Sequence, residues 1–357
     1  MCGFVGLLNK NQKPADAGIL ASMADKISHR GPDEEGIFTD NALGFYHKRL
    51  SIIDLSTGKQ PMTFNNCTIV FNGEIYNYVE LREDLKAKGH TFQTTSDTEV
   101  ILRMYFEMGD EFVNLLNGMF SFIIYDQPKQ RLFIARDHFG IKPLYWYNDE
   151  NLVLFGSEIK SLLAHPEVKS IPHKKNIHEY LTFQFILGEG TMFENIYKVM
   201  PGHSMVFDLN TGKSVRNKYW EPNFQLDCFH TEEYFIVELQ KILDQTIYQQ
   251  LRSDVPVGTY LSGGIDSSLV TIMSSKHYPG QLKSFSGAFH EGPEFNELEY
   301  ARIAANEGNA KLFEIYPTEQ EFIDYLPKLI YHLDEPVAGP GLFPQYMVSK
   351  LASEHVK

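Results

Sequence analysis

The sequence predicts two domains of different fold class: a layered α+β sandwich, followed by an α/β domain with a doubly wound parallel sheet. Three observations lead to this prediction. The chain has 357 residues, which is more than one hydrophobic core usually organises. Short runs rich in β-forming residues recur up to about residue 208, whereas strand and helix patterns alternate from residue 231 onwards.

Predicted strands dominate residues 1–208. Eight runs of β-forming residues lie between turns, at 3–8, 42–47, 50–54, 68–73, 119–126, 131–136, 143–147 and 151–156. Helical patterns at 78–88 and 98–108 lie among them. Helices among strands favour layered sheets with packed helices over a plain sandwich.

A linker and a second domain follow. Residues 209–230 combine turn residues, weak periodicity and a proline, which is typical of a linker. Residues 231–357 alternate between helices at 231–251, 267–277, 296–308 and 318–333 and strands at 255–261, 283–289 and 311–317. This alternation predicts a parallel, doubly wound sheet. Val356 and Lys357 look like the start of another core strand, so we expect a truncated sheet and a native protein that continues past Lys357.

Composition excludes several functional classes. Acidic residues outnumber basic ones by 46 to 32, the net charge is −14, and no Lys/Arg run occurs, which disfavours binding to nucleic acid. The sequence shows no secretory signal and no apolar run that could span a bilayer, so we expect no membrane association. The three cysteines, Cys2, Cys67 and Cys228, form no disulfide framework, which favours a reducing cytoplasm.

Cys2 directly follows the initiator methionine. Removal of Met1 would leave a thiol and an α-amine on one residue, and an amine that titrates at about 7.7 to 8.0 can accept the thiol proton near neutral pH. Gly3 and the apolar run 4–8 would place this nucleophile at the lip of a buried strand. From position alone, a small residue at a frayed terminus is the more frequent explanation.

Hydrolysis of a primary amide through a thioester needs donors for the oxyanion and a grip on the amino-acid end of the substrate. The side-chain amide of Asn72 and the N–H of Gly73 are candidate donors. Arg49 could bind an α-carboxylate, and Glu74 and Asp97 an α-ammonium group. Each has an ordinary alternative: a hairpin turn at 72–73, a surface ion pair for Arg49, and a helix cap for Asp97.

Seven motifs occur in order: MCGFVG, HRGPDEEG, HKRLSIIDLSTGKQPM, FNGEIYN, SDTEV, NGMFSF and RDHFGIKPLYW. They resemble the class II glutaminase domain of the asparagine synthetase family. The resemblance implies an αββα N-terminal-nucleophile sandwich in which residues 30–33 shape the pocket mouth, while His29 is structural. It implies catalytic roles for Cys2, Asn72 and Gly73. The glutamine-binding residues that it implies are Arg49, Leu50, Ile52, Ile53, Asn72, Gly73, Glu74 and Asp97.

The segment VPVGTYLSGGIDSSLV places a predicted strand before a glycine-rich turn and a helix start. Glycines let backbone N–H groups approach phosphate oxygens, and Ser262, Ser267 and Ser268 add hydroxyl donors. Asp266 would repel phosphate, so we predict that it meets Mg²⁺ bound to the nucleotide. The GxxxxGK[ST] motif does not occur, which favours cleavage between the α and β phosphates. The alternative is an ordinary strand-to-helix turn.

The SGGxDS pattern resembles the loop of the ATP-pyrophosphatase family, which activates a carboxylate or carbonyl by adenylation. The resemblance implies ATP as a substrate with Mg²⁺ and no organic prosthetic group. Gly287 occupies a position that often carries an aliphatic residue in relatives. The implied ATP-binding residues are Leu261, Ser262, Gly263, Gly264, Asp266, Ser267 and Gly287.

Together the resemblances imply a glutamine-dependent asparagine synthetase. Glutamine would be hydrolysed at Cys2, and the ammonia would pass internally to attack a β-aspartyl-adenylate made from aspartate and ATP. We expect this chain by itself to complete only the glutaminase reaction. Two alternatives stay open: a related amidotransferase with another carboxylate acceptor, and a non-catalytic glutamine-sensing module. The acceptor and the oligomeric state, with a homodimer among the options, are not determined by the sequence.

Overall fold

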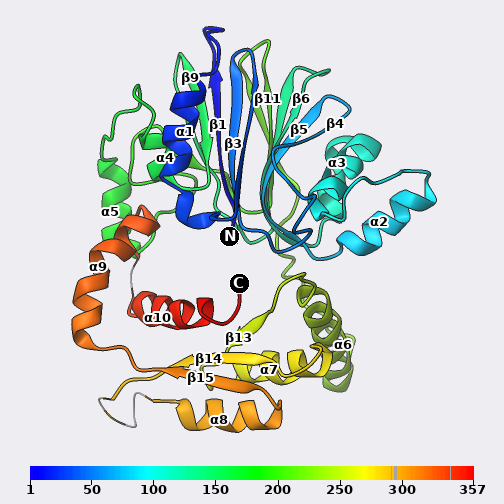
Figure 1. Ribbon diagram of the computed structural model, residues 1–357, viewed down its shortest axis with the longest axis vertical. Helices are drawn as coiled ribbons and strands as arrows, with labels where there is room; N and C mark the ends of the chain where they lie inside the picture. Colours follow the sequence, from blue (N-terminus) through cyan, green and yellow to red (C-terminus); the bar gives the residue numbers. More distant parts are fainter. Residues whose placement is uncertain (291, 293–295, 338) are drawn as a thin grey trace. The chain divides into compact units, whose positions relative to one another are not determined.

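The structure is a computed structural model that describes residues 1–290, 292, 296–337 and 339–357. These residues form two compact units, 1–223 and 224–357. The first contains two antiparallel sheets, and the second contains one parallel sheet (Figure 1). The predicted fold classes are therefore confirmed.

Each sheet of the first unit has six strands. The first sheet has the order β10-β8-β9-β1-β3-β2, and the second has the order β12-β11-β7-β6-β5-β4. The strands of the first sheet are β1 (Gly3–Asn9), β2 (Glu34–Asp40), β3 (Leu43–Arg49), β8 (Tyr145–Asn148), β9 (Leu152–Gly156) and β10 (Ile196–Lys198). Those of the second are β4 (Met62–Phe64), β5 (Cys67–Ile75), β6 (Gly118–Asp126), β7 (Arg131–Arg136), β11 (His203–Asp208) and β12 (Ser214–Lys218).

Three apolar clusters hold these layers together. The cluster between the sheets joins side chains such as Phe4 and Phe155 from one sheet to Val70 and Ile123 from the other. A second cluster packs α1 (Ala17–Asp25) and α4 (Ile159–Leu163) on the first sheet. A third packs α2 (Tyr78–Ala87), α3 (Asp97–Met108) and the 3₁₀ helix η2 (Gly109–Leu115) on the second sheet. The result is the predicted αββα arrangement (Figure 1), to which α5 (Lys174–Phe183) is added.

The prediction of a strand at 50–54 is wrong. This segment is an irregular loop after β3, and Asp54 has a φ of 55°, which a strand does not allow. The Asp54 carboxylate accepts hydrogen bonds from the N–H groups of Thr57 (2.7 Å) and Thr95 (2.8 Å). The guanidinium of Arg49 donates to the carbonyls of Ile53 and Asp54. These tertiary bonds outweigh the local β preference of the apolar run.

The segment 209–230 contains more structure than a linker requires. β12 lies within it and pairs with β11, for example through Val206 and Val215. The two compact units divide after Asn223. The proposed bounds 1–208, 209–230 and 231–357 therefore stay a prediction. β12 is the edge strand of the second sheet of the first unit.

The second unit has a parallel sheet in the order β13-β14-β15, formed by β13 (Gly258–Tyr260), β14 (Lys283–Gly287) and β15 (Lys311–Ile315). α7 (Ile265–His277) and α8 (Leu298–Glu307) lie on one face, and α10 (Leu342–Ser353) lies on the other (Figure 1). This is a doubly wound arrangement. Val356 packs against the cluster around Phe285 without joining a strand.

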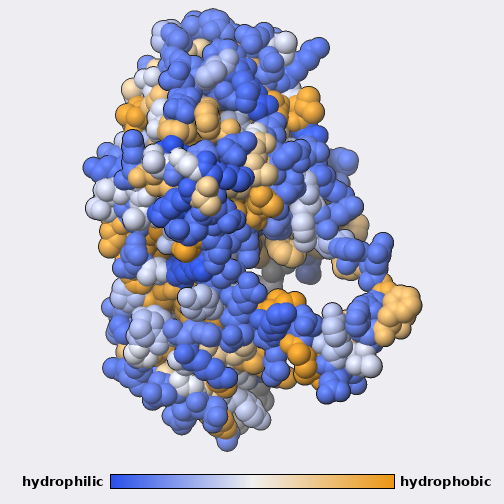
Figure 2. Space-filling view, turned by 90° about the vertical axis from the view of Figure 1, so that its right-hand side faces the viewer, coloured by the Kyte–Doolittle hydropathy of each residue, from blue (hydrophilic) through white to orange (hydrophobic). Residues whose placement is uncertain are grey.

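Two helices of the second unit expose much apolar surface. α6 (Glu232–Gln250) exposes side chains such as Ile236 and Leu239, and α9 (Glu319–Leu333) exposes Ile323 and Tyr331. Apolar patches interrupt the hydrophilic surface in Figure 2. Among the described residues, no helix is long and apolar enough to cross a membrane.

Candidate active site

The thiol of Cys2 lies beside the end of β3. The pairing of Gly3 with Lys48 brings the start of β1 next to Leu50, whose N–H lies 3.4 Å from the Cys2 sulfur and whose carbonyl lies 3.5 Å from it. The carbonyl of Cys2 accepts a hydrogen bond of 2.8 Å from Arg30 Nε. Cys2 is therefore held on both its main chain and its side chain, unlike a residue in a frayed terminus.

A buried ion cluster fixes Arg30 in this position. The Glu158 carboxylate binds Arg30 at 2.9 Å, His29 at 3.0 Å and Lys160 at 2.5 Å. Burial alone would raise the pKa of Glu158, but hydrogen bonds from these three basic side chains lower this pKa to about 2. His29, which was expected to be structural, is a member of this cluster.

The alternative prediction for Arg49 was an ion pair on the surface. Arg49 does form an ion pair, but the residue is buried. Its side chain donates to Glu34 at 2.6 Å, and only 4% of the residue is exposed. Its other terminal nitrogen contacts the carbonyls of the 53–54 loop. Leu50, Ile52 and Ile53, which were predicted to bind glutamine, are partly buried in the same loop. Glu34 is a member of this site that the sequence motifs did not single out.

Asn72 lies inside β5, so the alternative of a hairpin turn at 72–73 is wrong. The residue is fully buried, and among the described residues neither its side-chain nitrogen nor its side-chain oxygen has a hydrogen-bond partner. Buried amides are nearly always paired in folded proteins, because an unpaired one costs about 1–3 kcal/mol. The side-chain amide of Asn72 is therefore a donor and an acceptor that no described residue satisfies.

The N–H of Gly73 points away from β6. Gly73 lies opposite Phe120, whose N–H and carbonyl are both bonded to Asp137, at 3.1 and 2.8 Å. Because hydrogen-bonded and non-bonded pairs alternate along antiparallel strands, the N–H of Gly73 faces the opposite edge of β5. β4 covers that edge only as far as Ile69. A Cβ at Gly73 would lie 2.1 Å from the Met119 carbonyl, which explains the glycine.

Side chains bind the N–H groups on either side of Gly73. The N–H of Phe71 donates to Gln60 at 2.7 Å, and the N–H of Ile75 donates to Asp97 at 3.1 Å. The N–H of Gly73 lies between them, and no described residue accepts a hydrogen bond from it. The edge of β5 therefore presents one backbone donor next to the unpaired amide of residue 72.

Glu74, which is partly buried, and Asp97, which is buried, are two carboxyl groups close enough to act on one another electrostatically. Burial, with a smaller contribution from Asp97, raises the pKa of Glu74 to about 7. Burial also raises the pKa of Asp97 to about 6, although the N–H of Ile75 and other donors oppose this. Asp97 is the first residue of α3, but the cap of this helix is Ser96, so the alternative of a helix cap at Asp97 is wrong.

The predicted residues of the first unit act on one another electrostatically. Burial raises the pKa of the Cys2 thiol, whereas the hydrogen bond from Leu50, the terminal amine and the charge of Arg49 lower it. The charge of Asp97 raises it again. The structure therefore brings a thiol, a guanidinium and two carboxyl groups together around the start of β1.

The glycine-rich loop of the second unit lies at the carboxyl end of β13. Leu261 is fully buried and continues the pairing with β14, since its N–H donates to the carbonyl of Phe285 at 2.9 Å. Gly263 has a φ of 97°, and a Cβ there would lie 2.5 Å from the carbonyl of Glu297. Only glycine fits this conformation and this close approach. α7 begins immediately after Gly264.

Serine hydroxyls hold this loop in shape. The hydroxyl of Ser267 lies 3.0 Å from that of Ser262, accepts from the N–H of Ser262 and donates to the carbonyl of Gly264. Asp266 is exposed in the first turn of α7. The loop therefore presents the amino end of a helix together with a solvated carboxylate.

Gly287 ends the neighbouring strand β14, at the same edge of the sheet. A Cβ on this residue would lie 2.9 Å from Val348 of α10. The absence of an aliphatic side chain at 287 thus has a local reason, because Val348 occupies the adjoining space. Ligands of doubly wound sheets bind at this carboxyl edge.

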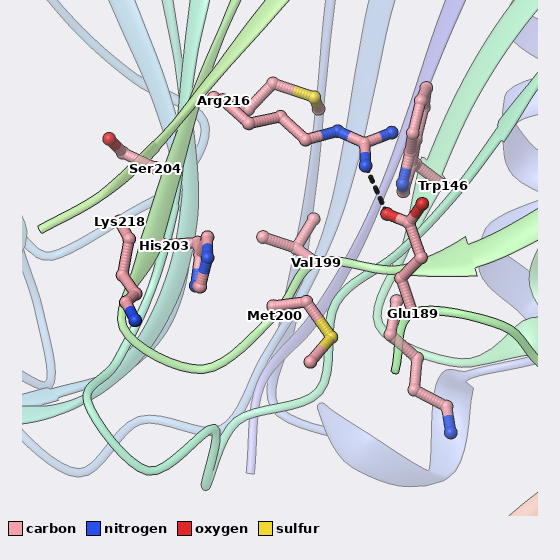
Figure 3. A pocket seen from close by; sticks show the side chains of 10 residues that line it. Trp146, Glu189, Val199, Met200, His203, Ser204, Arg216 and Lys218 are labelled. Carbon is pink, nitrogen blue, oxygen red and sulfur yellow. Dashed lines mark hydrogen bonds and ion pairs between the residues drawn. The ribbon is translucent and has the colours of Figure 1, made fainter. Parts of the chain in front are cut away.

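A separate pocket of about 320 Å³ lies on the first unit, lined by residues such as Trp146, Val199 and Met200 (Figure 3). Arg216 hydrogen-bonds to Glu189 across it, and the Arg216 guanidinium lies 5.2 Å from the Trp146 ring centroid. None of the predicted site residues lines this pocket. It is therefore distinct from the surroundings of Cys2.

Comparisons with known proteins agree with this geometry. Residues 1–220 match a family model described as glutamine amidotransferase domain, and residues 238–357 match one described as asparagine synthase. The chain is 41% identical to glutamine-hydrolyzing asparagine synthetase 1 of Bacillus subtilis, in an alignment that covers 100% of this chain and 56% of the relative. It thus spans little more than half the length of that protein.

A second relative is covered more fully. The chain is 35% identical to a putative glutamine-hydrolyzing asparagine synthetase of Methanocaldococcus jannaschii, over 100% of this chain and 72% of that protein. A solved structure described as the allosteric regulatory enzyme of purine biosynthesis is similar with a TM-score of 0.47 and 14% identity, over 88% of this chain and 80% of the other. Since a family model covers more than half of the sequence and the archaeal relative aligns along all of it, the chain belongs to the glutamine-hydrolysing asparagine synthetase family.

Proposed function

We propose that this chain hydrolyses glutamine to glutamate and ammonia, with Cys2 as the nucleophile. The observation that carries the proposal is the pair of unpartnered donors on β5, the buried amide of Asn72 and the N–H of Gly73. Two donors without an internal acceptor suit an oxyanion that forms only during the reaction. They lie in the same unit as the partly buried Cys2.

The reaction then follows from the groups at the site. Once Met1 is removed, the α-amine of Cys2 takes the thiol proton, and the sulfur forms a bond to the amide carbon of glutamine. The oxyanion accepts hydrogen bonds from Asn72 and Gly73. The amine returns the proton to the leaving nitrogen, the carbon–nitrogen bond breaks, and water hydrolyses the thioester to release glutamate.

Three charged groups orient the substrate in this proposal. Arg49 binds the α-carboxylate of glutamine, and Glu74 and Asp97 in their ionised forms bind the α-ammonium group. Leu50, Ile52 and Ile53 line the pocket beside them. The burial of these groups supports the assignment, because ion pairs in water-poor surroundings orient a substrate more strongly than exposed ones.

Ammonia release by the purified chain tests this proposal. Cys2→Ala should abolish ammonia release, whereas Cys228→Ala, which changes an exposed free cysteine, should leave it unchanged. Mass spectrometry should show that the active chain begins at Cys2. Full release by Cys2→Ala would refute the proposal. No release from a correctly processed wild-type chain would favour a glutamine-sensing module.

We also propose that the second unit supplies part of an ATP site for adenylation of aspartate, which the ammonia then converts to asparagine. The names of the relatives and the loop at 261–267 support this proposal. The exposed carboxylate of Asp266 fits a Mg²⁺ ion that keeps several waters and binds phosphate oxygens. When bound, Mg²⁺ would neutralise charge on the phosphates. The three free cysteines support a cytoplasmic location.

A further inference from the structure

Within the motif RDHFGIKPLYW, residues 137–142 form a loop that follows β7. The carboxylate of Asp137 accepts hydrogen bonds from four backbone N–H groups, those of Phe120 (3.1 Å), Phe139 (3.1 Å), Ile141 (2.9 Å) and Lys142 (3.0 Å). A single buried carboxylate thus fixes both ends of the loop. The function proposed above assigns no role to this loop.

Arg136 clamps the same loop from its other side. Its guanidinium donates to the carbonyls of Lys142 (2.8 Å), Gly140 (2.7 Å) and Val199 (2.7 Å). Gly140 has a φ of 68°, which lets the chain turn back between these contacts. The backbone of Lys142 is therefore fixed, and its side chain is presented in one direction.

The side chain of Lys142 reaches the N-terminus of the chain. Only 4% of the residue is exposed, and its Nζ lies 3.0 Å from the sulfur of Met1. A thioether is a weak acceptor, and no described carboxylate lies within ion-pair distance of this Nζ. Burying an ammonium group with so little compensation is costly, so folding alone does not account for it.

Charged groups from several elements act electrostatically on this ammonium. They are Glu74 on β5, Arg30 on the 3₁₀ helix η1 (Ser28–Arg30), Cys2, and Asp137 of the loop itself. Burial lowers the pKa of Lys142, while the carboxylate of Glu74 raises it. The ammonium therefore lies within electrostatic range of the nucleophile and of a predicted substrate ligand.

The terminal amine responds to the same groups. Burial, with smaller contributions from Arg30 and Lys142, lowers the pKa of the Met1 amine to about 6, although Cys2 and Glu74 oppose this change. A positive charge favours the uncharged form of a neighbouring amine. Only the uncharged form can accept a proton from a thiol.

We propose that Lys142 is a positioning residue for glutamine hydrolysis: once Met1 is removed, its ammonium faces the α-amine of Cys2 and favours the uncharged amine that accepts the thiol proton. The inference rests on the proposed glutaminase function. Lys142 forms no bond to the substrate carbon and transfers no proton. It acts through the amine and the thiol, and its effect is largest where the amine titrates.

The pH dependence of kcat/KM for glutamine tests the role of Lys142. Lys142→Met should shift the acidic limb of the profile to higher pH by about one unit, since it removes a neighbouring positive charge. The rate would then fall about tenfold near pH 6 and change less than about twofold at pH 9. Lys142→Arg should restore most of the wild-type profile. Lys48→Met is the matched control, since Lys48 is also buried but pairs with Glu35.

The rate of Cys2 alkylation by iodoacetamide, followed by peptide mass spectrometry, provides a readout that needs no turnover. The alkylation profile of Lys142→Met should shift in the same direction. Coincident profiles of wild type and Lys142→Met, or an equal loss of rate at every pH, would overturn the inference. A Lys142-dependent alkylation profile in a chain that releases no ammonia would support the role of Lys142 and refute the glutaminase proposal.

Discussion

The two candidate sites differ in how their polar groups are satisfied. Around Cys2, the amide of Asn72 is buried without a described partner, and burial raises the pKa values of Glu74 and Asp97. In the loop after β13, the hydroxyls of Ser262 and Ser267 bind one another, and Asp266 remains solvated. The first site therefore holds a buried amide that no described residue satisfies, whereas the serine hydroxyls of the second site are paired within the loop.

This difference matches the chemistry proposed for each site. Amide hydrolysis needs preorganised donors and a thiol whose proton can be removed, and burial makes both effective. Binding a magnesium nucleotide needs backbone amides and a helix terminus that an anion can approach from water. We therefore expect substitutions of the oxyanion donors in the first unit to change the rate of glutamine hydrolysis, and substitutions in the loop of the second unit to change nucleotide binding.

The largest effect should come from removing the unpaired amide. Asn72→Ala should lower kcat for glutamine hydrolysis by about 10²- to 10³-fold, because an oxyanion donor is worth that much. Steady-state kinetics would measure it, with Asn217→Ala on the exposed strand β12 as the control. A kcat within threefold of wild type would mean that Asn72 is an ordinary core residue and would remove the contrast between the sites.

The second prediction concerns the loop of the second unit. Asp266→Asn should weaken binding of ATP with Mg²⁺ by about 10- to 100-fold and leave ammonia release unchanged, because it removes one charge-assisted contact. Calorimetry with and without Mg²⁺ would measure the change. Glu299→Gln, which alters an acidic residue in the first turn of α8, is the matched control. Equal affinity of wild type and Asp266→Asn would argue against a metal contact at this residue.

The third prediction concerns the affinity for glutamine as a function of pH. The pKa of Glu74 is raised to about 7, so this carboxyl is ionised at pH 8 and mostly protonated at pH 6. Because only the ionised form attracts the α-ammonium group, KM should rise about tenfold between pH 8 and pH 6. A KM that stays flat over this range in the wild type would contradict the assignment of Glu74.

The smallest predicted effect is on stability. A carboxyl whose pKa is raised on folding opposes folding once the pH exceeds its unfolded pKa of about 4.3, and protonation relieves this opposition. Glu74→Gln should therefore raise the unfolding midpoint at pH 8 by about 2–4 °C while it weakens glutamine binding. Differential scanning calorimetry would measure both midpoints at pH 8 and pH 5. The increase in unfolding midpoint caused by Glu74→Gln should be smaller at pH 5 than at pH 8. A lower midpoint at pH 8 would mean that the charge of Glu74 stabilises the fold.

Periodicity identified most of the secondary structure, and its failures have local causes. The run at 50–54 has strand composition, but tertiary bonds to Asp54 and from Arg49 turn it into a loop. β2 was missed because its partly buried and exposed residues alternate without a long apolar run. The helix after residue 341 was missed, although Phe343, Met347 and Val348 form a buried stripe at helical spacing.

The candidate site was predictable in its residue types but not in its contacts. Motif order pointed to Cys2, Asn72 and Asp97, which are far apart in the sequence. Glu34 pairs with Arg49 because β2 folds against β3. Lys142 contacts Met1 because the loop after β7 folds against the start of β1. No spacing rule relates residues that meet only through such packing.

The ion pair between Arg49 and Glu34 has a consequence for selectivity. Without substrate, the guanidinium of Arg49 is paired with Glu34. In the proposed complex, the substrate carboxylate therefore replaces one counterion of Arg49 with another. The net affinity then depends on the difference between two similar pairings and not on a full ion-pair energy. A ligand gains from this exchange only if its ammonium and amide ends are also held. In that proposed complex, Glu34 would compete with the substrate for Arg49 and favour whole amino acids over simple carboxylates.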